Sequence, residues 1–415
     1  MLNWISPPRP LVFLSLFMLI GLVPRSGAHA SEFSTLHYFA GPPGDGGRPW
    51  SSLVADNAGN LYGTTNVGGG TDACRGYKAI SCGTVFKLMP NGSDTVLHAF
   101  TGQPDGAYPL AGLVEDGSGN LYGTTTYGGA SNRGAVFRVA ADGTETVLYS
   151  FAGKHGVNPE AVLIIDSSGN LYGTTAYGGD PNCPERVLPS GCGVVFKIAP
   201  DGTEIVLHAF ANGGEGNEPL GGLVMDQSGN LYGMTQLGGN GFGNIFEVAP
   251  DGTETVLYTF QGEPDGARPA GELIMDGAGN LYGTTGFGGN PCQHSIFGCG
   301  TVFKLEPNGS ESVLYAFNQG CCDGIVPDAG LVADAEGNVY GTTLFGGDPE
   351  CGCGAVFKLT ASGTESVLHA FQCGKGAEPG ASLLLRKDDL YGTTFGGNFC
   401  GRGGHRWGSA FELRK

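Results

Sequence analysis

The chain has 415 residues, of which 77 are glycine and 24 are proline; only 14% are charged, and the formal net charge is −18. So much glycine excludes a helical protein, because each glycine inside a helix costs about 0.5–1 kcal/mol relative to alanine. The 40% share of hydrophobic residues excludes a disordered chain, and the acidic balance argues against nucleic acid and membrane surfaces as partners.

Residues 1–30 have the pattern of a secretory signal peptide. The apolar run at 11–23 precedes the triplet Ala28-His29-Ala30, whose small-x-small form is typical of a cleavage site. This run is too short to span a membrane, which needs about 20 residues. We therefore expect an exported protein, extracellular or periplasmic, with no membrane span and with residues 31–415 as its single domain.

After a first strand expected at 35–39, four short motifs recur seven times in a fixed order. They are an apolar run led by proline (109–114), a Gly-Asn-Leu-Tyr-Gly-Thr-Thr segment (119–125), a Gly-x-x-Phe segment (83–88) and a run ending in phenylalanine (146–151). Each is rich in β-branched or aromatic residues and bounded by turn formers, which is typical of strands. The repeat is marked by Tyr62, Tyr122, Tyr172, Tyr232, Tyr282, Tyr340 and Tyr391.

Four strands in each of seven repeats predict an all-β fold, a seven-bladed β-propeller. The chain ends directly after the seventh Gly-x-x-Phe segment, so the last blade lacks its outer strand, and residues 35–39 match that missing strand. We expect the N-terminal strand to complete the last blade and close the ring, which removes an exposed sheet edge. Strand alternation puts the two longer links of every repeat on one side, which we call the loop face.

The repeated Gly-Asn-Leu-Tyr-Gly-Thr-Thr, Gly-Gly and Gly-x-Val-Phe-Lys segments resemble the GloVer tandem-repeat family of exported bacterial proteins. The resemblance covers residues 34–415. It implies a repeat array at the cell surface or exterior and implies no established catalytic residues. Some relatives carry a C-terminal anchoring segment; this chain ends at Arg414-Lys415, from which we expect a freely exported protein.

Cysteines in an exported chain are expected to form disulfides. The short spacings predict the local pairs Cys74–Cys82, Cys183–Cys192 and Cys292–Cys299, each bracketing an insertion in a Gly-Gly link. The other six allow 15 connectivities. We favour Cys373 with Cys400, and bonds that join the pair Cys321 and Cys322 to the pair Cys351 and Cys353.

Two repeated polar positions suggest metal ligands but have simpler interpretations. The aspartates of the Asp-x-x-Gly-Asn turns are explained by capping of their own turns; they are Asp56, Asp116, Asp166, Asp226, Asp276 and Asp334. One outer-strand position alternates histidine with tyrosine, an exchange that argues against metal binding or base catalysis; it holds His37, His98, Tyr149, His208, Tyr258, Tyr315 and His369. We expect no metal and no cofactor.

The residue before each inner-strand proline varies while the frame around it is constant. Because a position that breaks the repeat is not needed for folding, we expect these side chains to ring the mouth of the central channel, with three others nearby. The candidate ligand-binding residues are Arg48, Trp50, Asp105, Tyr108, Asn158, Glu218, Asp265, Arg268 and Glu378. Val326 occupies the same position in the sixth repeat.

These side chains predict a monomeric binding module whose partner is a polar extracellular ligand, either a glycan or a protein. Two alternatives stay open. One is an extracellular polysaccharide or glycan lyase or hydrolase with its site at the same mouth, for which the sequence indicates no catalytic residues. The other is a purely structural surface module, since fold alone does not decide function.

Overall fold

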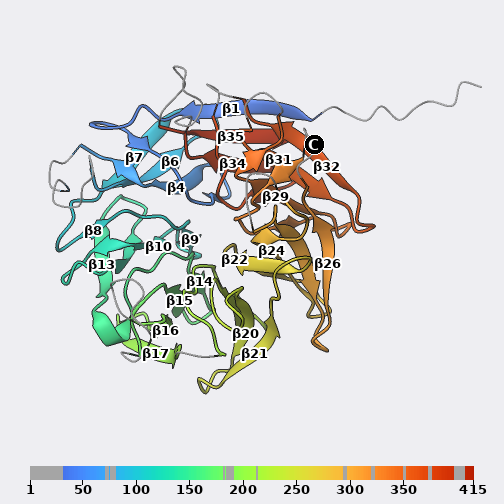
Figure 1. Ribbon diagram of the computed structural model, residues 1–415. Helices are drawn as coiled ribbons and strands as arrows, with labels where there is room; N and C mark the ends of the chain where they lie inside the picture. Colours follow the sequence, from blue (N-terminus) through green and yellow to red (C-terminus); the bar gives the residue numbers. More distant parts are fainter. Residues whose placement is uncertain are drawn as a thin grey trace, which may run out of the picture. The chain divides into compact units, whose positions relative to one another are not determined.

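A computed structural model describes residues 31–70, 74, 81–180, 183, 191–211, 214–292, 297–318, 323–348, 352–372, 376–396 and 407–415. The chain divides into the units Met1–Ala30 and Ser31–Lys415; the predicted signal peptide lies outside the described residues. In the second unit, seven antiparallel sheets follow one another around a ring (Figure 1). The described part of the chain has no α-helix and therefore no helix that could cross a bilayer. The all-β, seven-bladed propeller is confirmed.

Each blade has an inner, a second, a third and an outer strand. The inner strands are β3 (Val54–Ala55), β9 (Val114–Glu115), β14 (Ile164–Ile165), β18 (Val224–Met225), β23 (Ile274–Met275), β28 (Val332–Ala333) and β33 (Leu384–Arg386). The second strands are β4 (Leu61–Thr65), β10 (Leu121–Thr125), β15 (Leu171–Thr175), β19 (Leu231–Thr235), β24 (Leu281–Gly288), β29 (Val339–Thr343) and β34 (Asp389–Thr394).

The third strands carry the Gly-x-x-Phe motif. They are β6 (Thr84–Leu88), β12 (Ala135–Val139), β16 (Val194–Ile198), β20 (Asn244–Val248), β25 (Thr301–Leu305), β31 (Ala355–Leu359) and β35 (Ser409–Arg414). The outer strands are β7 (Asp94–Ala99), β13 (Glu145–Ser150), β17 (Glu204–Ala209), β21 (Glu254–Thr259), β26 (Glu311–Ala316), β32 (Glu365–Ala370) and, for the last blade, β1 (Glu32–Tyr38).

The ring closes through the two ends of this unit, as the missing outer strand predicted. β1 pairs antiparallel with β35, from Glu32 opposite Arg414 to Tyr38 opposite Ser409, and the two strands lie side by side in Figure 1. The Thr393 hydroxyl in the last blade donates to the Ser51 carbonyl of the first blade at 2.9 Å. Both contacts tie the last blade to the start of the chain.

Phenylalanines join each blade to the next. The phenylalanine after each outer strand meets the third-strand phenylalanine of the following blade edge-to-face, with ring centroids 5.0–5.2 Å apart. These rings are buried, and such pairs contribute about 0.5–1.5 kcal/mol beyond the burial of their area. The core of the ring is therefore a series of similar inter-blade contacts.

The inner strands are much shorter than the proline-led runs predicted. In the second repeat the run was expected at 109–114, but the ladder holds only Val114 and Glu115. Proline lacks the N–H that a ladder needs, and carbonyls that follow it accept hydrogen bonds from another blade: the Thr64 hydroxyl donates to Ala111 at 2.9 Å. The first residues of this run therefore lie outside the ladder and line the centre of the ring.

The loop face carries additional short pairings that the sequence did not predict. Residues before the proline pair with residues after the Thr-Thr dipeptide and extend several blades toward this face. These pairs are β2 (Gly46–Gly47) with β5 (Val67–Gly68), β8 (Gly106–Ala107) with β11 (Tyr127–Gly128), β22 (Gly266–Pro269) with β24, and β27 (Gly324–Ile325) with β30 (Phe345–Gly346). They position the side chains of the candidate site.

Candidate functional site

The residue before each proline has the same backbone conformation in all seven repeats. Its φ lies between 52° and 59°, in the left-handed region that is rare for residues other than glycine. Its N–H donates at 2.6–3.1 Å to the carbonyl that precedes the third strand of the previous blade, as from Tyr108 to Cys82. The backbone at this position thus joins adjacent blades, and only the side chain is free to vary.

Two arginines in this series lie over aromatic rings. The Arg48 guanidinium carbon is 5.6 Å from the centre of the Phe395 ring and 5.8 Å from that of Trp407. The corresponding atom of Arg268 is 5.7 Å from the Phe287 ring and 5.6 Å from the Phe297 ring. Cation–π contacts of this kind hold the guanidinium in place while leaving its N–H donors available.

Each of these arginines acts on a glutamate at the same position of the preceding repeat. Burial raises the pKa of Glu378, and the positive charge of Arg48 opposes that rise. Burial likewise raises the pKa of Glu218, and the positive charge of Arg268 opposes that rise. Four of the predicted residues therefore interact electrostatically as two pairs of opposite charge.

Tyr108 and Asn158 contribute polar groups of other kinds. The Tyr108 ring meets the Tyr127 ring edge-to-face at 5.7 Å. The Asn158 side chain is buried, and its amide nitrogen donates to the Thr126 carbonyl at 2.7 Å. Asn158 is therefore committed to a hydrogen bond within the protein.

The central cavity has a volume of about 100 Å³ and is lined by the residues after the prolines. Trp50 is the one member of the predicted set in its lining, beside small residues such as Ala111 and Gly221. Three acidic residues that the sequence reasoning missed also line it: Glu160, Glu272 and Asp328. Glu160 and Asp328 directly follow the proline, a position that also varies between repeats; that variation was the available signal.

Burial raises the pKa of each of these three acids. It raises the pKa of Glu160 to about 7, with a further contribution from the charge of Glu218. It raises the pKa of Asp328 to about 6 and also raises the pKa of Glu272, which accepts a 2.8 Å hydrogen bond from the Ser382 hydroxyl. The cavity can therefore exchange protons near neutral pH.

A second, apolar cavity of about 480 Å³ lies along the inner strands of three consecutive blades. Its walls include Ile164, Val224 and Ile274, and Glu272 lines both cavities. Its volume falls within the range of small-molecule sites, although it has few polar groups to orient a ligand.

Asp105 and Asp265 lie beside outer-strand residues of the preceding blade. The Asp105 carboxylate is 3.2 Å from His98 Nε2 and also accepts from the Thr101 backbone N–H at 2.9 Å. The Asp265 carboxylate accepts from the Tyr258 hydroxyl at 2.9 Å. Neither residue lines the central cavity, so the structure does not bring these two together with Trp50.

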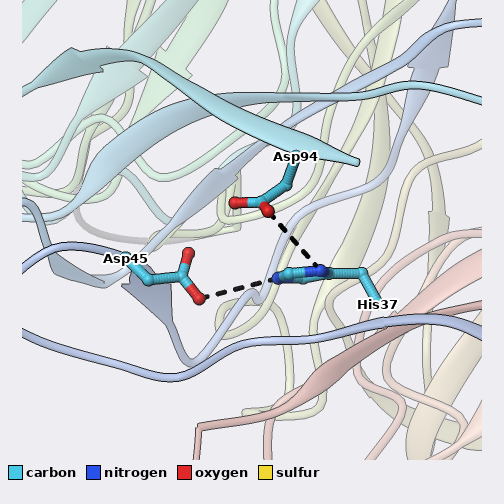
Figure 2. Close-up of side chains that lie close together, drawn as sticks. All are labelled: His37, Asp45 and Asp94. Carbon is cyan, nitrogen blue, oxygen red and sulfur yellow. Dashed lines mark ion pairs between the residues drawn. The ribbon is translucent and has the colours of Figure 1, made fainter. Parts of the chain in front are cut away.

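Such contacts form a series that we call the seams. A seam combines the histidine or tyrosine of one outer strand, a residue of the link that follows, and the acid that begins the next outer strand. Figure 2 shows the first seam, in which His37 lies between Asp45 and Asp94. Among the described residues, three seams bring one imidazole and two carboxylates within 4.8 Å: His37, Asp45 and Asp94; His98, Asp105 and Glu145; His208, Glu215 and Glu254.

The turn aspartates use their carboxylates within their own turns. Asp56 accepts hydrogen bonds from the Asn60 backbone N–H at 2.9 Å and from the Tyr62 hydroxyl at 3.0 Å. The five equivalent turns have the same bonds. In the seventh repeat, Tyr391 donates instead to Glu412 at 2.7 Å. The repeated tyrosine thus has a structural role.

The three local disulfides are present as predicted: Cys74–Cys82, Cys183–Cys192 and Cys292–Cys299. Cys353 is disulfide-bonded as well. The remaining cysteines lie outside the described residues, and their pairing stays a prediction: Cys321, Cys322, Cys351, Cys373 and Cys400.

Solved structures similar to this chain include the extracellular domain of a protein from B. thetaiotaomicron that is classed as a one component system (13% identity, TM-score 0.54). The same domain described as part of a hybrid two component system gives 14% identity and a TM-score of 0.55. Both matches cover 92% of this chain but only 41% and 42% of those chains, so this chain spans about two fifths of their length.

A gluconolactonase from Xanthomonas campestris is a more distant match, with 17% identity and a TM-score of 0.42 over 77% of this chain and 87% of that one. At these identities the likeness concerns the fold alone. No curated protein matches the sequence. The Gloeobacter/Verrucomicrobia repeat matches residues 20–185, 70–289 and 185–405, which together span nearly the whole chain. The repeats, the ring that they build and this match agree: the chain belongs to the Gloeobacter/Verrucomicrobia repeat family.

Proposed function

We propose that this is an exported protein that binds a glycan across the centre of its loop face. Disulfides persist in oxidising compartments outside the cytosol, and the bonds at Cys74, Cys183 and Cys292 support export. The proposal for the ligand depends on the side chains before the prolines, which vary on a constant backbone.

The observation that carries the proposal is a pair of unsatisfied polar atoms at neighbouring positions. Arg48 Nε and Glu378 Oε1 are buried and have no hydrogen-bond partner among the described residues. A buried polar atom without a partner costs about 1–3 kcal/mol. A ligand hydroxyl, which both donates and accepts, would satisfy a guanidinium N–H and a carboxylate oxygen together.

The aromatic rings around these charged groups favour a sugar. Phe395 and Trp407 flank Arg48, and Tyr108 and Tyr127 follow in the next repeat. Aromatic rings offer apolar faces to the C–H surface of a sugar ring, while nearby polar groups bind its hydroxyls. The central cavity of about 100 Å³ is below the 300–1,000 Å³ of typical ligand pockets, so the glycan would lie across the mouth.

Replacement of Arg48 by alanine tests this site. We expect the Arg48→Ala variant to lose at least about tenfold in affinity for the polysaccharide that the parent retains, because removing a bound charged group leaves its partner unpaired. The measurement is retention on a panel of immobilised polysaccharides, followed by titration with soluble oligosaccharides. Arg386→Ala is the matched control, since Arg386 ends an inner strand beside the Asp56 turn, away from the loop face. Equal retention by the parent and Arg48→Ala would refute the site.

One observation favours the enzymatic alternative: Glu160, in the central cavity, has a pKa of about 7 and is influenced by Glu218. A carboxyl group that titrates near neutral pH is suited to general acid–base catalysis. Release of oligosaccharide products by the parent, abolished in Glu160→Gln, would establish a hydrolase or lyase. Retention without products supports the binding module, and neither retention nor products leaves the structural module.

A further inference from the structure

The seam between the third and fourth blades has a buried histidine nitrogen that faces a carboxylate without a close hydrogen bond to it. His208 lies in β17, Glu215 in the following link, and Glu254 begins β21 of the next blade. His208 Nε2 is 3.6 Å from Glu215 Oε2, beyond hydrogen-bonding distance. Nε2 is nevertheless buried and has no partner among the described residues, and the same is true of Glu254 Oε1.

The orientation of the imidazole is set from its other side. His208 makes a hydrogen bond to the backbone of Gly252, which leaves Nε2 as the nitrogen turned toward the two carboxylates. A metal-binding histidine typically has this arrangement, with one nitrogen held by the backbone and the other free for the ion.

The other seams use the same positions differently. His98 Nε2 is 3.2 Å from the Asp105 carboxylate, within hydrogen-bonding distance, whereas Glu215, which accepts from the Ala211 N–H at 3.0 Å, lies 3.6 Å from His208. The two nitrogens of His37 face different carboxylates, Asp45 and Asp94 (Figure 2). His37 Nε2 also lacks a close hydrogen bond, at 3.6 Å from Asp45, but Asp94 lies on the Nδ1 side, so the two carboxylates do not face one nitrogen.

In two seams that have tyrosine in place of histidine, the tyrosine hydroxyl donates a hydrogen bond to the acidic residue of the link. Tyr258 donates to Asp265 at 2.9 Å, and Tyr315 donates to Asp323 at 3.0 Å. The exchange of histidine with tyrosine argued against metal binding because all seven outer-strand positions were taken as one class. The seams differ from one another, so this argument does not apply to His208.

We propose that His208, Glu215 and Glu254 form a binding site for a zinc-type divalent cation that joins the third and fourth blades. Zinc is bound by imidazole nitrogens and carboxylate oxygens, and a site with three protein ligands is completed by a fourth ligand such as water. Bond lengths of about 2.0–2.2 Å to a tetrahedral ion place the ligand atoms about 3.3–3.6 Å apart, and the 3.6 Å between His208 and Glu215 needs little adjustment. The nitrogen ligand favours zinc over calcium or magnesium, which prefer oxygen.

The test is a titration of the full chain, without a polyhistidine tag and freed of metal by dialysis against a chelator, with Zn²⁺, Co²⁺ and Ca²⁺. His208→Tyr places in this seam the residue that the Tyr258 seam already has, so we expect it to fold and to bind one equivalent of zinc fewer than the parent. Glu254→Gln, which keeps the side chain's shape, should lose the same equivalent. The Co²⁺ complex should show visible absorption that both variants lack.

His98→Tyr is the matched control and should keep the parent's zinc stoichiometry, because Asp105 already pairs with His98 Nε2. Zinc should also raise the melting temperature of the parent and of His98→Tyr but not that of His208→Tyr, since a ligand bound only to the folded state stabilises it. Unchanged zinc stoichiometry in His208→Tyr, equal losses in both histidine variants, or binding of calcium in place of zinc would overturn the proposal.

Discussion

Individual residues explain why so much of this chain is glycine. A Cβ atom on Gly63 would lie 2.8 Å from the Phe86 ring and 2.9 Å from Leu53, closer than real contacts allow. The glycine of the Tyr-Gly step meets its blade's third-strand phenylalanine in the same way in every other repeat: Gly123, Gly173, Gly233, Gly283, Gly341 and Gly392. The absence of a side chain is thus a packing requirement of the blade, and it needs no unusual backbone angle.

Replacement of Gly63 by alanine should therefore destabilise the protein by about 1–3 kcal/mol, the usual cost of overpacking a core. The free energy of unfolding in urea measures the effect. Gly117→Ala is the control, because nothing lies within 4 Å of a Cβ at Gly117, and we expect a change within about 0.5 kcal/mol. If the two substitutions had equal effects, packing against Phe86 would not explain the glycine.

The side-chain variation before the prolines was visible in the sequence, but the backbone conformation there was not. Left-handed φ values are commonly inferred from glycine or asparagine, and this position holds Arg48, Val326 and Glu378 among others. The acids of the central cavity were missed for a related reason. The residue after the proline, such as Glu160 or Asp328, faces the axis because the inner strand begins several residues later than the sequence predicted.

At the scale of elements, the seams place ionisable side chains where outer strands of neighbouring blades meet. Burial and the charge of Asp265 raise the pKa of Glu311 to about 7. The Tyr258 hydroxyl, which donates to Asp265 at 2.9 Å, opposes this rise only in part.

The sign of the resulting pH dependence follows from this shift. The pKa of an unfolded glutamate is about 4.3, so folded Glu311 holds its proton more tightly, and its contribution is full below about pH 4 and lost as the pH rises through 7. Glu311→Gln, which is always neutral, should be more stable than the parent by about 1 kcal/mol at pH 8, a value reduced for solvent screening at this half-exposed group.

The two proteins should have nearly equal free energies of unfolding at pH 4, and urea denaturation at several pH values measures the difference. Glu336→Gln removes an exposed glutamate of the same charge and is the control. A Glu311→Gln variant that parallels the parent from pH 4 to pH 8 would show that Glu311 does not titrate in this range.

The strand pattern was largely predictable, whereas the seams were not. Tandem motifs such as the one at Tyr122 repeat the same local signal seven times, so one strand assignment carries over to the others. A seam such as that of His208, Glu215 and Glu254 draws on two blades. No local sequence pattern links residues of two blades, and the orientation of the His208 ring depends on a contact with Gly252.

At the scale of the whole molecule, stability depends on the pairing of β1 with β35. Deletion of residues 31–38 would expose the edge of β35 and remove Phe33, which stacks on His369 at 3.7 Å and lies 5.5 Å from Phe411. We expect a markedly lower melting temperature and aggregation, because an open edge pairs with other chains.

Thermal denaturation and light scattering measure both effects. Glu32→Ala is the control within the same strand. The Glu32 side chain is 76% exposed and its carboxylate lies 3.9 Å from the Arg414 guanidinium. Surface ion pairs of this kind contribute at most about 1 kcal/mol. If the shortened protein melted at the temperature of the parent, β1 would not be needed to hold the ring closed.

The pairing of β1 with β35 also has a kinetic consequence. Its partners are separated by almost the whole described chain, from Glu32 to Arg414, and contacts so distant in sequence form slowly. During synthesis β1 is the first of the described strands to emerge, and it must wait for the last one. A chain interrupted just before Ser409 has six complete blades and two unpaired edges. Only a chain that includes β35 can close the ring, and shorter chains expose strand edges to proteases.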